Sequence, residues 1–80
     1  MVSGRVPRLN CTFDEFVEII VAHGFSLHRQ GATSHRRYRA EIDGVVYFVD
    51  VAGHGNERIK PGTLKSMIRQ SGLPSRIFRK

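Results

Sequence analysis

Residues 34–39 read SHRRYR and bring one histidine and three arginines together. An imidazole ordinarily titrates near pH ~6.5, so His35 can give or take a proton at neutral pH. Cleavage of RNA needs a base for the 2′-OH, an acid for the leaving 5′-oxygen and positive charge on the phosphorane. From this residue alone, a histidine that only contacts RNA is the simpler interpretation, and a catalytic histidine is the sharper one.

The arginines around His35 suit phosphate, because a guanidinium is a planar fork that can hold two oxygens at once. In a strand, Arg37 and Arg39 project to one face, while Arg36 lies at the start of the strand. Solvated charges that prevent edge-to-edge association are the alternative. Ser34 has no acidic partner for a triad, so we expect it to orient His35 or a phosphate. On this side of the chain, the residues predicted to contact RNA are Arg29, Ser34, Arg36, Arg37 and Arg39.

A second set of phosphate ligands is predicted at residues 60–65, KPGTLK, where a helix should begin. Pro suits the first helical position, and the free amides that follow it lie at the positive end of the helix dipole. Gly62 allows a phosphate to come close. Ordinary helix initiation with solvated lysines is the alternative. The candidate ligands here are Lys60, Gly62, Thr63 and Lys65.

The elements that position these residues begin with a helix over residues 12–23. Thr12 and Glu15 have the spacing of a capping box, and Gly24 suits the end of the helix. His23 is most simply a partner for the helix C-terminus. The expected apolar stripe consists of Phe13, Phe16, Val17, Ile20 and Val21.

Three strands are expected next, over residues 25–30, 34–42 and 45–51, with a turn at 31–33. Asp43-Gly44 is a strong signal for a two-residue hairpin turn, which would place Ile42 opposite Val45. That register predicts one face with Tyr38, Ala40, Ile42, Val45, Tyr47, Val49 and Val51, which we expect to be the core face. The other face would hold His35, Arg37, Arg39, Val46, Phe48 and Asp50, with Asp50 opposite Arg37 and Phe48 opposite Arg39. In the first strand, Phe25, Leu27 and Arg29 are expected on one face, with Ser26, His28 and Gln30 on the other.

A polar loop over residues 52–60 and a helix from Pro61 to Gly72 complete the pattern, with Leu64, Met67 and Ile68 on the apolar side of that helix. The order α-β-β-β-α predicts an α+β fold with both helices on one face of a three-stranded antiparallel sheet. We expect a single domain over residues 1–80. Residues 1–10 are expected to be a loose arm, and residues 75–80 a basic tail that is either a short helix or disordered.

The net charge of +6 is unevenly distributed, because residues 12–23 hold three acids and no lysine or arginine. A basic surface set apart from an acidic one favours a polyanionic partner. The lone Cys11 excludes an intrachain disulfide and a CxxC pair. We expect a cytoplasmic protein, since neither a signal peptide nor a membrane span is evident. No metal is expected, because the histidines lack HxH or HxxxH spacing.

The chain resembles the HicA family of small bacterial toxins, which are mRNA interferases. The segments that carry the resemblance are Gly24-Phe25 with Arg29-Gln30 and Ser34-His35, then His54-Gly55-Asn56, then Ile59-Lys60-Pro61-Gly62-Thr63-Leu64 with Ile68-Arg69-Gln70-Ser71-Gly72-Leu73. The family often has Gly directly before Ser-His, whereas here Ala32-Thr33 separates Gly31 from Ser34.

The resemblance implies a fold like that of a double-stranded-RNA-binding domain and a HicB-type antitoxin that covers the active site. It also implies that His35 is the catalytic histidine of an endoribonuclease acting on mRNA without metal or cofactor. Two other hypotheses fit the residues: a module of the same fold that binds RNA without cutting it, and a protein that docks another protein through Phe48 and Val46. His28 and His54 could take part, and the second proton carrier is not identified.

Overall fold

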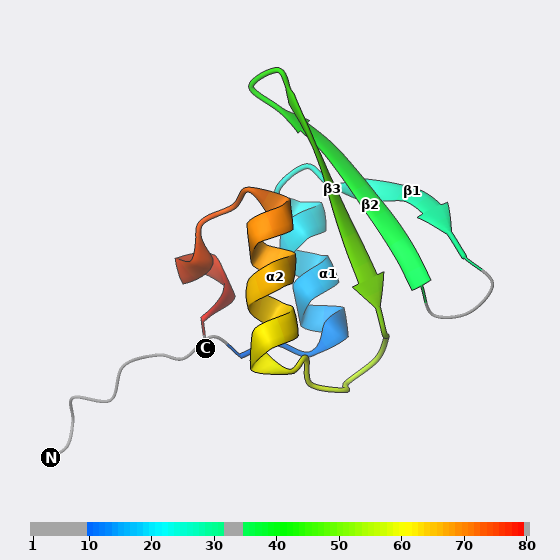
Figure 1. Cartoon of the computed structure of the whole chain (residues 1–80), viewed down its shortest axis with the longest axis vertical. Coiled ribbons are helices and arrows are strands. Elements are labelled where there is room, and N and C mark those ends of the chain that lie inside the picture. Colours follow the sequence, from blue (N-terminus) through cyan, green and yellow to red (C-terminus); the bar gives the residue numbers. More distant parts are fainter. Residues whose placement is uncertain (1–9, 32–34, 80) are drawn as a thin grey trace, which may run out of the picture.

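In the computed structural model, residues 10–31 and 35–79 are described. The elements are α1 (Phe13–Ala22), β1 (Ser26–Gln30), β2 (His35–Ile42), β3 (Val45–Ala52), α2 (Pro61–Ser71) and a 3-10 helix η1 (Ser75–Phe78). Both helices cover one face of the sheet (Figure 1), so the predicted α+β fold with the order α-β-β-β-α is confirmed. The arm predicted over residues 1–10 falls outside the described residues except for Asn10, and Ala32-Thr33-Ser34 also falls outside them.

The sheet is antiparallel in the order β1-β2-β3. Asp43 and Gly44 both have positive φ, 53° and 79°, which makes the tight turn that the sequence predicts. Ile42 therefore pairs with Val45, Arg39 with Phe48 and Arg37 with Asp50, and this register is confirmed. One face of β2 and β3 consequently meets the helices, and the opposite face is open to solvent.

The core lies between the sheet and the two helices. Phe16, Ile20 and Leu64 are fully buried from the helices, and Val49 is fully buried from the sheet. The predicted capping box is confirmed, since the Glu15 amide donates to Thr12 Oγ1 and the Thr12 amide donates to Glu15 Oε1. Val21, predicted in the apolar stripe, is instead half exposed. Ile19 packs against the core, because the helix is rotated toward that residue.

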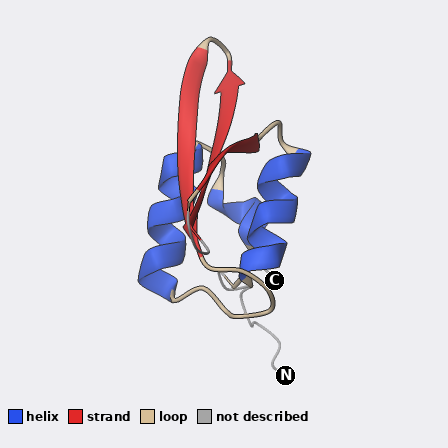
Figure 2. Ribbon diagram, turned by 90° about the vertical axis from the view of Figure 1, so that its right-hand side faces the viewer, coloured by secondary structure: helices blue, strands red, loops and turns tan. Residues whose placement is uncertain are grey.

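The β2–β3 hairpin extends beyond the helices that cover its base (Figures 1 and 2). Val45, which the alternation predicts on the core face, is on that face but 50% exposed, because the tip of the hairpin has no helix beneath it. Val49 and Val51, near the base, are buried as predicted. Alternation thus gives the correct face, while the length of the helices decides which part of that face is covered.

A β-bulge in β1 changes which side chains reach the open face. Ser26 pairs with Arg39 and Leu27 with Tyr38, but the register then shifts, so that Arg29 pairs with Arg37 and Gln30 with Arg36. The bulged strand has an extra residue at His28. Arg29 therefore shares the open face with Arg37, and the prediction that it shares a face with Leu27 is wrong.

The segment after α2 packs onto the core. Gly72 ends α2 with φ 69°, and Ser75–Phe78 then form η1. Phe78 is fully buried, and its ring stacks on that of Phe16 with 5.1 Å between centroids. Of the two expectations for this segment, a short helix or disorder, the structure has the short helix, and its aromatic residue belongs to the core.

Candidate functional site

His35, the first residue of β2, lines an open hollow of about 270 Å³. The hollow lies where the base of β2 meets β1 and β3. Its other lining residues are Arg29, Gly31, Arg36, Arg37 and Asp50. The structure therefore brings together four of the residues that the sequence singles out for chemistry, His35, Arg29, Arg36 and Arg37. Ser34 lies outside the described residues.

The backbone around His35 is fixed by the end of β1. The Gly31 amide donates a hydrogen bond of 2.7 Å to the His35 carbonyl. A Cβ at Gly31 would lie 3.3 Å from that same oxygen, so glycine allows the two chains to come this close. On its other side, His35 pairs with Ala52 of β3. The main chain of the histidine is thus held between both neighbouring strands while its side chain stays exposed.

Arg37 and Asp50 form an ion pair across β2 and β3. Arg37 Nε donates to Asp50 Oδ1 at 2.8 Å, and Nη2 donates to Oδ2 at 3.4 Å. The hydrogen bond and the charge of the Asp50 carboxylate raise the pKa of Arg37, which is therefore a cation at every working pH. The Asp50 amide in turn donates to Gln70 Oε1 at 3.1 Å, which ties this strand edge to α2.

Arg36 is engaged on the opposite side of the sheet from Arg37. Its Nη2 donates to the Gly53 carbonyl at 2.9 Å and its Nη1 to the Tyr38 hydroxyl at 3.2 Å. Its guanidinium also lies over the Tyr38 ring. Sequence reasoning missed this tie, because its partner is 17 residues away in the loop after β3.

Arg29 and Arg39 complete the cations of the open face. Arg39 Nη2 lies 3.8 Å from Glu41 Oε1, at the margin of an ion pair. Arg29 makes no ion pair with any residue in the described ranges 10–31 and 35–79 and is fully available to a ligand. The bulge in β1 is what brings Arg29 to this face, beside Arg37.

An aromatic side chain also lies on the open face. The Phe48 ring is 5.3 Å from the His28 ring in an edge-on arrangement, and the guanidinium carbon of Arg37 is 5.4 Å from the centroid of Phe48. Phe48 remains 39% exposed. His28, Arg37 and Phe48 come from β1, β2 and β3 respectively and form a row across the sheet.

The residues predicted at the start of α2 form a separate set. Lys60 is the N-cap residue without a side-chain capping bond, Pro61 is the first helical residue, and Gly62 and Thr63 are exposed. The first-turn amides of Gly62 and Thr63 have no partner within the helix. None of these residues lines the hollow around His35.

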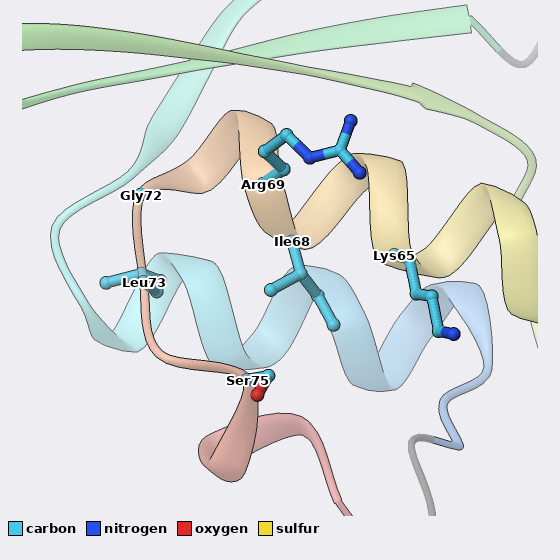
Figure 3. A pocket seen from close by; sticks show the side chains of 6 residues that line it. All are labelled: Lys65, Ile68, Arg69, Gly72, Leu73 and Ser75. Atoms are coloured by element: carbon cyan, nitrogen blue, oxygen red, sulfur yellow. The ribbon is translucent and has the colours of Figure 1, made fainter.

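Lys65 lines a different groove, of about 320 Å³, between α2 and η1. Figure 3 shows Lys65 on the side of α2 turned away from the sheet, whereas Arg69 points toward the strands. The floor of the groove is apolar and includes Ile68 and Leu73. The structure thus separates Lys65 from the histidine with which the sequence grouped it.

The remaining histidines differ in their surroundings. His23 Nδ1 lies 2.8 Å from the Ile19 carbonyl at the end of α1, in agreement with its predicted place at the helix C-terminus. His54 is exposed in the loop before α2. Within residues 10–31 and 35–79, no three His, Cys, Asp or Glu side chains gather closely enough to hold a metal ion. Over the same ranges, no helix is both long and apolar enough to span a membrane.

A two-helix, three-stranded domain with a histidine in a hollow of arginines defines a class of small basic proteins suited to phosphate chemistry. A family described as the HicA toxin of bacterial toxin–antitoxin systems matches residues 13–73, and the chain belongs to this family. Membership makes the protein the toxin of a toxin–antitoxin pair, with an antitoxin as its partner. No curated protein and no solved structure matches the chain.

Proposed function

We propose that the protein is an endoribonuclease that cleaves mRNA with His35 as general acid or base. The observation that carries this proposal is the hollow in which the exposed His35 lies with Arg29, Arg36 and Arg37. A proton carrier and guanidinium groups beside one cavity are what transfer of the RNA phosphate to its own 2′-oxygen requires. The reaction needs no metal or cofactor, because the arginines stabilise the charge on the phosphorane.

The RNA backbone would lie along the open face, where Arg29, Arg37 and Arg39 can bind phosphates. An exposed ion pair contributes only about 0–1 kcal/mol, so Arg37 and Arg39 can exchange their carboxylate partners for phosphate at little cost. Arg36 retains further N–H donors toward the hollow. We also propose phosphate contacts for Ser34 beside His35 and, at α2, for Lys60, Gly62, Thr63 and Lys65.

A module that binds RNA without cutting it is the second candidate. It is favoured by the ion pairing of Arg37 and Arg39, because paired arginines hold less charge ready for a transition state. The proposed partner in the cytoplasm is a HicB-type antitoxin, which would cover the hollow and exclude RNA.

The test is induction of the toxin without its antitoxin in bacterial cells. Wild type is expected to arrest growth and deplete full-length mRNA, whereas His35→Ala does neither. His23→Ala is the matched control, because His23 lies at the end of α1 and outside the hollow, and it should arrest growth as wild type does. Growth arrest by His35→Ala with intact mRNA would favour the binding module.

A further inference from the structure

The open face of the sheet carries a phenylalanine that the ribonuclease mechanism does not use. Phe48 lies on β3 directly opposite Arg39 and is 39% exposed. Full burial of a Phe side chain stabilises a fold by about 1.5–3 kcal/mol, and at this position little of that is realised. Its neighbours on the face are flat groups, the imidazole of His28 at 5.3 Å and the guanidinium of Arg37 at 5.4 Å.

We propose that Phe48, flanked by His28 and Arg37, is the stacking site for an unpaired nucleobase of single-stranded RNA. The inference rests on the proposed RNA-directed function and adds to it the class of substrate. Aromatic rings on an open sheet face bind bases in this way in other RNA-binding folds, since every base has a π-face. A base in a duplex is already stacked on both sides and does not reach such a ring.

The charges around Phe48 favour RNA over an apolar protein surface as the occupant. A protein that buried this ring would also desolvate the Arg37–Asp50 pair, which is costly. A nucleotide covers the ring with its base and offers its phosphate to the same arginines. Arg37 belongs to both places, because it lines the hollow of His35 and lies beside the Phe48 ring.

The site lies beside the reacting bond rather than at it. Arg39, opposite Phe48, is four residues along β2 from His35, which corresponds to about 13 Å of strand. A base on Phe48 therefore belongs to a neighbouring nucleotide, and this site selects unpaired RNA and sets its position on the sheet without a part in proton transfer.

The experiment uses the full chain with His35→Ala, so that bound RNA stays intact. Affinity for a single-stranded oligoribonucleotide and for the perfectly paired duplex of the same sequence is measured at low salt. Phe48→Leu is expected to weaken single-strand binding roughly tenfold and to leave duplex binding unchanged. Val46→Ala, on the same face of β3, is the matched control and should change neither affinity. Circular dichroism shows that each variant is folded.

A spectroscopic arm reports stacking directly, because the chain has no tryptophan. Phe48→Trp should retain single-strand affinity, and its indole fluorescence should be quenched when the RNA binds. Val45→Trp, on the helix side of the same strand, should not be quenched. RNA binding that is equal in Phe48→Leu, or no quenching at position 48 while RNA is bound, would overturn the stacking site and leave the ribonuclease proposal standing. A protein that binds no RNA in any form would overturn both.

Discussion

Arg37 Nε and Asp50 Oδ1 lie 2.8 Å apart across β2 and β3, on the floor of the hollow that contains His35. The side chains are 48% and 59% exposed, so the pair is a surface ion pair that contributes little to stability. Its consequence is functional, because Asp50 competes with phosphate for the arginine closest to the proposed stacking site.

Asp50→Asn should release Arg37 for phosphate. Since Asp50 raises the pKa of Arg37, the arginine loses this stabilisation but stays charged at neutral pH. We expect single-strand affinity in the His35→Ala background to rise by up to about fivefold, and the salt dependence to steepen. Binding titrations over a range of salt concentrations measure both, and weaker binding by Asp50→Asn would contradict the competition.

Arg29 and Arg36 should respond differently to truncation. Arg36→Ala removes hydrogen bonds to Gly53 and Tyr38 and should lower the free energy of unfolding by about 1–2 kcal/mol. Arg29→Ala removes no internal contact, so it should change stability by less than about 0.5 kcal/mol but reduce the salt slope of RNA binding by about 0.7. Urea denaturation and salt titrations separate the two, and equal stability losses would be inconsistent with the structure.

Gly62→Ala tests whether a phosphate binds at the start of α2. A Cβ at Gly62 meets no atom within 4 Å, so alanine should stabilise the helix by about 0.5–1 kcal/mol. The same methyl group would stand between a phosphate and the first-turn amides, and RNA affinity should fall. Increased stability together with unchanged RNA binding would remove α2 from the proposed interface.

Phe78→Ala should lower the free energy of unfolding by about 3–5 kcal/mol, because Phe78 is fully buried against Phe16. That loss is comparable to the whole stability of many small domains. Arg79→Ala, the neighbouring exposed residue, is the control and should be nearly neutral. Chemical denaturation measures both, and a loss below about 1 kcal/mol for Phe78→Ala would show that η1 contributes little to the core.

The sequence predicts the sheet well where local chemistry decides the structure. Asp43-Gly44 accepts positive φ at both turn positions, and with a period of two this fixes every partner along β2 and β3. The pairing of Arg37 with Asp50 and of Arg39 with Phe48 follows from that turn alone.

What the sequence does not predict depends on contacts distant in the chain. No glycine or proline marks the bulge at His28, so the face of Arg29 could not be read from alternation. The tie from Arg36 to Gly53 depends on how the loop after β3 folds back. The exposure of Val45 depends on where the helices end, and the burial of Phe78 depends on Phe16 at the other end of the chain.

The most direct test of the account is cleavage of a single-stranded RNA by purified protein in the presence of EDTA. Wild type should release fragments that end in a 2′,3′-cyclic phosphate, and His35→Ala should be slower by at least about 100-fold. A substrate with a 2′-deoxy sugar at the cut site should stay intact. Intact RNA with wild type, or equal cleavage by His35→Ala, would contradict the assignment of His35.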